Sequence, residues 1–188
     1  LSRFGRVTGV DAHDEAIGYC RAAGLGDSVI KAEVEALPFP DRAFDFIFAL
    51  DLLEHVPDDI RPLRELRRTL RDDGLVCFTV PAFSWLWSRA DEREHHYRRY
   101  RREDFTARLR QAGFTPIRVT YFNTFLFIPI AFAKLSAKVF EPKALVASEV
   151  HLPRFFNNVL FKIFSAESLI LPHINFPVGV SILAIARR

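Results

Sequence analysis

The chain has 188 residues, of which 49% are hydrophobic and 26% are charged, and its formal net charge is +3 at pH 7. This composition predicts one globular domain with a sizeable core, excludes a disordered chain and gives little support for a nucleic-acid partner. No apolar run approaches the ~20 residues of a membrane span. Cys20 and Cys77 are the only cysteines and lack metal-type spacing, so we expect reduced thiols and a cytoplasmic location.

The first half of the chain alternates short apolar runs with helical patterns. Strand 44–50 is almost continuously apolar, as expected of a parallel strand buried on both faces. Ile60, Leu63 and Leu66 recur at helical spacing. The predicted elements are strand 7–10, helix 14–23, strand 29–32, strand 44–50, helix 57–70, a turn at 72–74 and strand 75–80.

The second half is rich in phenylalanine, and most of the 19 Phe residues lie between Phe105 and Phe176. Its predicted elements are helix 103–112, strand 114–122, helices 124–140 and 155–171, and strand 178–186. Pro129 should interrupt the first apolar helix, and the last strand could close the edge of the sheet. Strands alternating with helices predict an α/β fold, a Rossmann-like doubly wound sheet.

Two of these strands end in acidic residues. Asp11 follows the strand 7–10, and Asp51 follows the strand 44–50. Carboxylates at the C-terminal ends of buried parallel strands point into the crevice where open α/β sheets bind ligands. An acid there can accept both hydroxyl protons of a ribose, so this pattern predicts a nucleotide-type cofactor. Capping of a turn or helix is the alternative interpretation for either aspartate.

Several motifs in this order resemble the class I S-adenosylmethionine-dependent methyltransferases, and specifically a bacterial type-11-like subgroup with a hydrophobic C-terminal region. The resemblance implies the cofactor S-adenosylmethionine and methyl transfer to a small-molecule or lipid-like acceptor. The motifs are Val10-Asp11, the block 33–39, the block 44–56, the helix 63–70 with Asp73-Gly74-Leu75, and the block 85–100.

The resemblance also implies a cofactor site. Asp11 should bind the ribose hydroxyls, with Ala12 beside the adenine. Glu33 should contact the adenine amino group, and the backbone N–H of Val34 should bind adenine N1. The methionine end should be lined by Ala49, Leu50 and Asp51. Among these, Glu33 could equally be a surface carboxylate.

Two family features are missing. The Gly-rich loop and the first strand do not occur, and the chain has no Met. We therefore expect one N-terminally truncated methyltransferase domain, 1–188, whose absent strand belongs between strands 7–10 and 44–50. Each buried backbone group left without a partner costs about 1–3 kcal/mol, so the fragment alone should be neither stable nor active.

Substrate residues are harder to assign, and the sequence indicates neither a metal site nor a catalytic base. His55 could be structural or lie near the acceptor. Trp85 and Trp87 could line an acceptor pocket or simply be buried aromatics. The basic segment 89–102 could hold an anionic substrate through His96, Arg99 and Tyr100, could be a loop that these residues lock to the sheet, or could bind RNA.

The hydrophobic helical region at about 121–172 also has two interpretations. It could rest on a membrane surface or admit a lipid-like substrate, or it could be a lid packed on the sheet. The alternatives to a methyltransferase are a non-catalytic cofactor-fold partner or scaffold, and a nicotinamide oxidoreductase; the blocks 37–39 and 54–56 argue against the latter by resemblance. The oligomeric state is not indicated.

Overall fold

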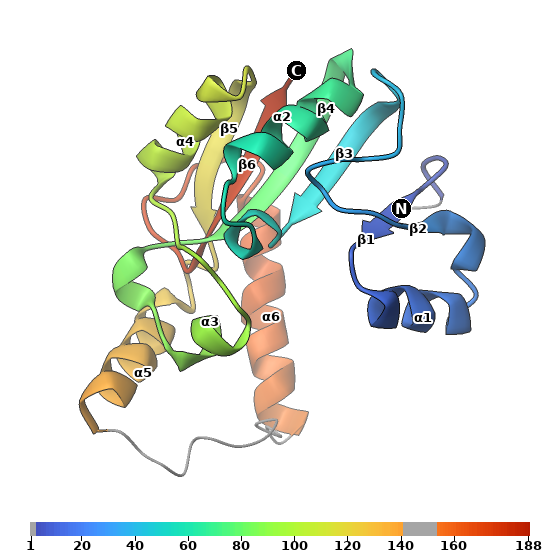
Figure 1. The fold of residues 1–188 in the computed structure, drawn as a ribbon. Helices are drawn as coiled ribbons and strands as arrows, with labels where there is room; N and C mark the ends of the chain where they lie inside the picture. Colours follow the sequence, from blue (N-terminus) through green and yellow to red (C-terminus); the bar gives the residue numbers. More distant parts are fainter. Residues whose placement is uncertain (1–2, 141–153) are drawn as a thin grey trace.

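The computed structural model describes residues 3–140 and 154–188, which form a mixed α/β structure (Figure 1). The elements follow the predicted order closely. They are β1 (Gly9–Asp11), α1 (Asp14–Ala22), β2 (Val29–Lys31), β3 (Phe44–Leu50), α2 (Ile60–Thr69), β4 (Leu70–Pro81), α3 (Arg89–Arg93), α4 (Arg102–Gln111), β5 (Thr115–Phe122), α5 (Phe127–Phe140), α6 (Arg154–Ile170) and β6 (Ser181–Arg187), with short 3-10 turns at Gly26–Ser28, Leu53–His55 and Ser84–Leu86.

The strands form two separate sheets. β1 and β2 pair in parallel, with Asp11 opposite Lys31. The other sheet has the order β3-β4-β6-β5, in which β3 and β4 are parallel and β6 is antiparallel to both of its neighbours. The expected α/β fold is therefore present as two separate sheets, and no strand among the described residues joins them.

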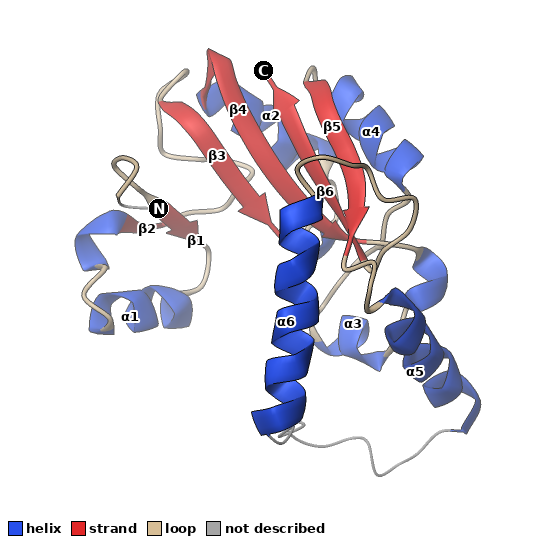
Figure 2. Ribbon diagram, turned by 180° about the vertical axis from the view of Figure 1, so that it is seen from behind, coloured by secondary structure: helices blue, strands red, loops and turns tan. Residues whose placement is uncertain are grey.

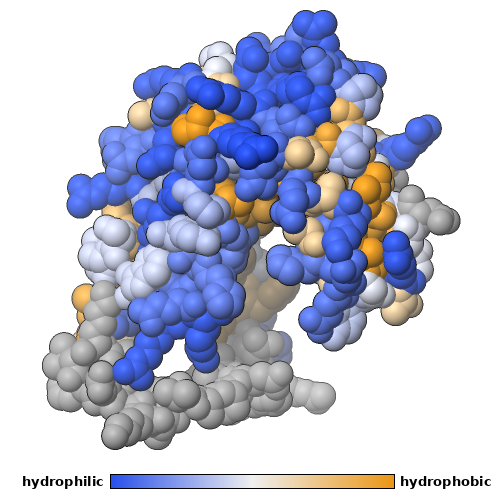
Figure 3. Space-filling model, in the orientation of Figure 1, coloured by the Kyte–Doolittle hydropathy of each residue, from blue (hydrophilic) through white to orange (hydrophobic). Residues whose placement is uncertain are grey.

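One face of the larger sheet is covered by α2 and α4, and this side of the molecule is mainly hydrophilic (Figures 1 and 3). Beneath these helices lies the core, whose fully buried residues include Leu63, Phe78, Phe105 and Ile182. The apolar spacing of α2 accounts for this packing, since Leu63 and Leu66 face the sheet and the helix carries its arginines outward.

The opposite face of the larger sheet is open over β3. No helix of the described residues crosses it in the view from behind (Figure 2). Phe46, Phe48 and Leu50 are 43%, 48% and 54% exposed, although alternate residues of the strand pack on the core. The prediction that β3 is buried on both faces is therefore wrong for this structure, because nothing among the described residues covers that side.

Three smaller predictions are also corrected. The expected turn at 72–74 lies within β4, as an irregularity opposite Phe44 and Phe46. The last strand, β6, lies inside the sheet between β4 and β5 rather than at its edge. Pro129 does not interrupt α5, because it falls in the first turn, where a helix needs no N–H donor.

None of the described helices is long and apolar enough to cross a membrane. The helices α5 and α6 instead extend away from the sheet in both ribbon views (Figures 1 and 2). Glu167 of α6 is buried, and its Oε2 accepts hydrogen bonds from the backbone N–H groups of Thr124 and Phe125 at 2.8 and 3.2 Å. This contact ties α6 to the start of the segment that leads into α5.

Candidate functional site

Three strands leave the larger sheet through unusual backbone conformations. Asp51 follows β3, Phe83 lies two residues after β4, and Asn123 follows β5; their φ angles are 48°, 56° and 59°. These left-handed values are rare for residues other than glycine and concentrate at functional sites. Because β3, β4 and β5 run in the same direction, the three residues lie at one edge of the sheet, which we call the strand-exit edge.

The end of β3 presents one charged and one apolar side chain at this edge. The backbone N–H of Asp51 donates to the carbonyl oxygen and to the Oγ1 of Thr79, each at 3.0 Å, which fixes the turn. Asp51 itself is exposed, Leu50 is exposed, and Ala49 is buried in the core. The three residues assigned to the methionine end of a cofactor are thus together, with Leu50 and Asp51 accessible.

Asp11 ends β1, and its carboxylate is half-exposed. Oδ1 accepts a hydrogen bond from the backbone N–H of His13 at 2.8 Å, so Asp11 caps the turn that enters α1. Oδ2 has no hydrogen-bond donor among residues 3–140 and 154–188. The capping role and the proposed ribose role are therefore compatible, because one carboxylate oxygen serves each.

The other residues assigned to the adenine end lie near the ends of β1 and β2. Ala12 is half-buried beside Asp11, and Glu33 is exposed in the loop after β2. Val34 is half-buried and its side chain packs against the main core, which leaves its role as an adenine contact to the backbone N–H. The backbone N–H of Ala32 donates to the carbonyl of Asp11 at 3.1 Å and keeps the two strand ends adjacent.

The basic segment after β4 is held by a buried carboxylate, Asp91, which is 1% exposed. Its Oδ1 accepts from Arg99 at 2.6–2.7 Å, and its Oδ2 accepts from the N–H and hydroxyl of Ser88, each at 2.9 Å. Burial opposes the charge of Asp91, but Arg99, Ser88 and Lys134 hold its pKa well below the usual range. Arg99 also donates to the carbonyl of Ala82 at 3.0 Å, so this arginine locks the segment to the sheet.

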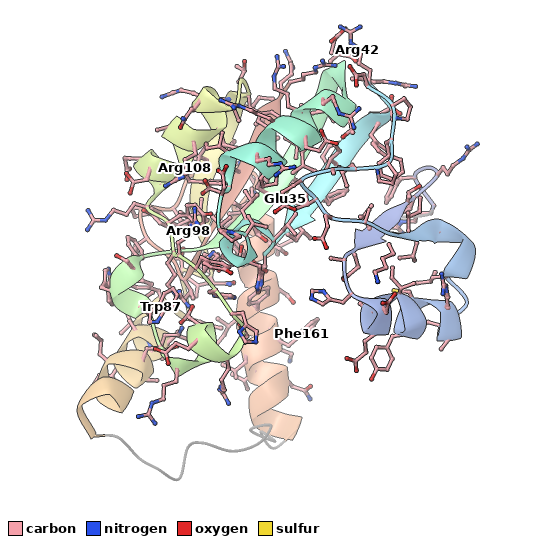
Figure 4. All side chains as sticks on the ribbon, in the orientation of Figure 1. Glu35, Arg42, Trp87, Arg98, Arg108 and Phe161 are labelled. Carbon is pink, nitrogen blue, oxygen red and sulfur yellow. The ribbon has the colours of Figure 1, made fainter. Side chains whose placement is uncertain are left out.

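A second buried carboxylate, Asp59, holds the end of the same segment. It accepts the hydroxyl of Tyr100 at 2.9 Å and the guanidinium of Arg108 at 2.6 Å, and Arg98 lies 3.2 Å away. Arg108 comes from α4 and Arg98 from the loop that precedes it (Figure 4). Burial first, and then Asp59, raise the pKa of the Tyr100 hydroxyl, so it acts as a hydrogen-bond donor. These contacts are those expected of a locked loop.

Glu54, His55 and His96 meet close to the strand-exit edge. Burial raises the pKa of Glu54 to about 8, and Asp51 adds to this effect. The pKa of His55 is lowered by burial and by His96, whose ring lies edge-on at a centroid distance of 4.6 Å. The sequence left the roles of both histidines open and did not single out Glu54.

The two tryptophans lie beyond β4 near α5. Trp85 is 40% exposed and contacts the rings of Phe83 and Phe127, while Phe83 stacks on Tyr121 at 5.0 Å. Trp87 is half-buried between the 3-10 turn and α3 (Figure 4). The aromatic cluster therefore covers the strand-exit edge on the side of α5 and offers Trp85 to solvent.

The sequence analysis missed three buried acids near the candidate site, Glu54, Asp59 and Asp91. A signal for two of them was present, because a basic segment that packs against a sheet needs carboxylate partners. Spacing alone does not identify which acid pairs with which arginine, since Asp59 lies 49 residues before its partner Arg108.

A family model described as a methyltransferase domain matches residues 1–78. The chain is 28% identical over 114 residues to a probable S-adenosylmethionine-dependent methyltransferase of Mycobacterium tuberculosis, covering 60% of this chain and 42% of that protein. It is 31% identical over 93 residues to a demethylmenaquinone methyltransferase of Staphylococcus epidermidis, covering 45% and 39% of the two chains. It therefore spans about two-fifths of the length of these curated relatives.

Among solved structures, a phosphoethanolamine N-methyltransferase of Haemonchus contortus, determined in complex with S-adenosyl-L-methionine, shares the fold. The TM-score is 0.61 at 17% sequence identity, and the alignment covers 100% of this chain and 44% of that one. This similarity supports the Rossmann-like fold expected from the sequence.

Replacing Arg99 with Gln should lower the free energy of unfolding by about 3–5 kcal/mol, because it leaves the buried Asp91 charge without its main partner. Chemical denaturation of the intact protein measures this loss. Arg101→Gln, at an exposed position in the same segment, is the matched control and should change stability by less than about 0.5 kcal/mol. Equal stability of the two variants would contradict the locking role.

Proposed function

We propose that this chain is a class I S-adenosylmethionine-dependent methyltransferase that transfers a methyl group from S-adenosylmethionine to a small-molecule or lipid-like acceptor. The observation that carries the proposal is the family match over residues 1–78, which contains every residue assigned to the cofactor. The curated relatives include methyltransferases named for quinones, and another for a sterol.

The chemistry of the strand ends fits the cofactor. Asp11 keeps Oδ2 available for the hydroxyls of a ribose, and a carboxylate forms strong hydrogen bonds with such donors. Leu50 offers exposed apolar surface near Asp51, which suits the mixed polar and apolar character of a methionine side chain. S-Adenosylmethionine supplies an electrophilic methyl group on a sulfonium, and the protein's task is to hold an acceptor in line with it.

An acceptor would reach the strand-exit edge between the 84–97 segment and α5. Trp85 and Phe127 provide an aromatic wall there, and the exposed His55 provides a polar group. A lipid-like acceptor is favoured by the exposed apolar residues of the two long helices, among which Phe132, Phe161 and Leu169 are 72%, 69% and 75% exposed. Contact with a membrane surface is part of the same proposal.

Asp11→Ala should weaken the binding of S-adenosylhomocysteine to the intact protein by about 1.5–3 kcal/mol, the range for loss of a charged hydrogen-bond partner. Isothermal titration calorimetry measures the change. Asp14→Ala is the matched control, since Asp14 is exposed on α1 and pairs with Lys31. Unchanged affinity in the Asp11 variant would remove this residue from the site. Binding of NAD, with no binding of S-adenosylhomocysteine, would favour an oxidoreductase.

We also propose that residues 1–188 need a further strand between β1 and β3. The position of β3 at the open edge of the larger sheet and the separation of the two sheets support this. Purified 1–188 should therefore melt without a sharp cooperative transition and should not bind S-adenosylhomocysteine. A sharp transition that shifts upward with the ligand would contradict the proposal.

The intact protein should float with anionic liposomes in a density gradient, because the apolar residues of α5 and α6 would be buried in the interface. Phe132→Ser together with Phe161→Ser should reduce the floated fraction, while Tyr19→Ser, at an exposed aromatic of α1, should not. Protein that stays wholly in the dense fractions would remove membrane contact from the proposal.

A further inference from the structure

The cluster of Glu54, His55 and His96 has the composition of a transition-metal site. One potential ligand atom from each residue lies within 4.8 Å of those from the other two. Two imidazoles and one carboxylate suit zinc and iron better than magnesium or calcium, which prefer oxygen ligands.

Glu54 provides the independent evidence that a ligand is expected. Its side chain is 1% exposed, and its Oε2 is buried with no hydrogen-bond partner among the described residues. A buried carboxylate oxygen without a partner costs several kcal/mol, so native structures rarely retain one. A bound cation would satisfy this atom.

The backbone holds the three residues together without help from a ligand. The N–H of Tyr97 donates to the carbonyl of Glu54 at 2.7 Å, which joins the 3-10 turn after β3 to the loop after α3. The N–H of His96 donates to the carbonyl of Asp91 at 2.9 Å. Two segments separated by about forty residues are thereby fixed beside each other, as a preformed site requires.

Asp91 also orients the ring of His96. Its Oδ1 lies 3.1 Å from Nδ1 of His96, so the imidazole can donate a proton there and keep a lone pair on Nε2. Metal-binding histidines commonly have a carboxylate in this position. Nε2 lies 3.4 Å from Oε2 of the exposed Glu94, a carboxylate outside the group of three.

We propose that Glu54, His55 and His96 bind a first-row divalent transition metal ion of the zinc or iron type. Bonds of ~2.0–2.2 Å place neighbouring ligand atoms about 3–4 Å apart, so the side chains must close slightly around the ion. The site lies beside Asp51 at the strand-exit edge. The inference does not depend on methyl transfer, because metal binding can be measured without cofactor or acceptor.

The test uses the intact, untagged protein, treated with EDTA and freed of chelator. Titration with Zn²⁺ should show one saturable site, and Co²⁺ should give visible absorption bands that report nitrogen and oxygen ligands. Glu54→Gln and His96→Asn should each weaken Zn²⁺ binding by more than about 100-fold, beyond the 10–100-fold effect of losing a supporting residue.

His95→Asn is the matched control, because His95 is the exposed neighbour of His96 and lies outside the cluster. Its affinity for Zn²⁺ should equal that of the unaltered protein. If His96→Asn does not fold by circular dichroism, His55→Asn decides, since His55 is exposed and makes fewer contacts. Absence of saturable binding, or equal affinity in the His55 and His95 variants, would overturn the proposal.

Discussion

Two buried carboxylates, Asp59 and Asp91, determine the conformation of the segment between β4 and α4. Each is 1% exposed, and each is compensated by arginine together with hydrogen-bond donors. A charge taken out of water this far is tolerated only when its partners are in place, so the segment has one arrangement that satisfies both acids. That arrangement holds the segment against the sheet, and it brings His96 next to the turn that follows β3. The candidate site depends on these two acids, although neither needs to touch a ligand.

Much of the fold was predictable from local pattern. The strand Phe44–Leu50 was located to the residue, and the helices 14–22, 102–111 and 154–170 lay within one residue of prediction at each end, because apolar periodicity and glycine stops act over short distances. Strand order was less accessible. The position of β6 between β4 and β5 follows from pairing with β4 across 100–112 residues and with β5 across 59–72 residues, which no local pattern contains.

The site was predictable to a smaller extent. Acidic residues after strands indicated Asp11 and Asp51, and the structure places both at strand ends. The roles of Arg99 and Tyr100 stayed open, because an arginine that binds an anionic ligand and one that pairs with a buried aspartate look the same in a sequence. Only the partner distinguishes them, and Asp59 and Asp91 become partners through tertiary contacts. The orphaned oxygen of Glu54 is likewise a property of the packed state.

The left-handed residues Asp51, Phe83 and Asn123 have a consequence for how such a protein diversifies. Each one turns the chain sharply sideways as it leaves its strand, so the loop that follows begins from a fixed point and a fixed direction. Insertions or exchanges within those loops need not propagate into the strands behind them. The sheet can therefore stay unchanged while the loops that follow its strands are exchanged, in evolution or by design, to bind a different molecule.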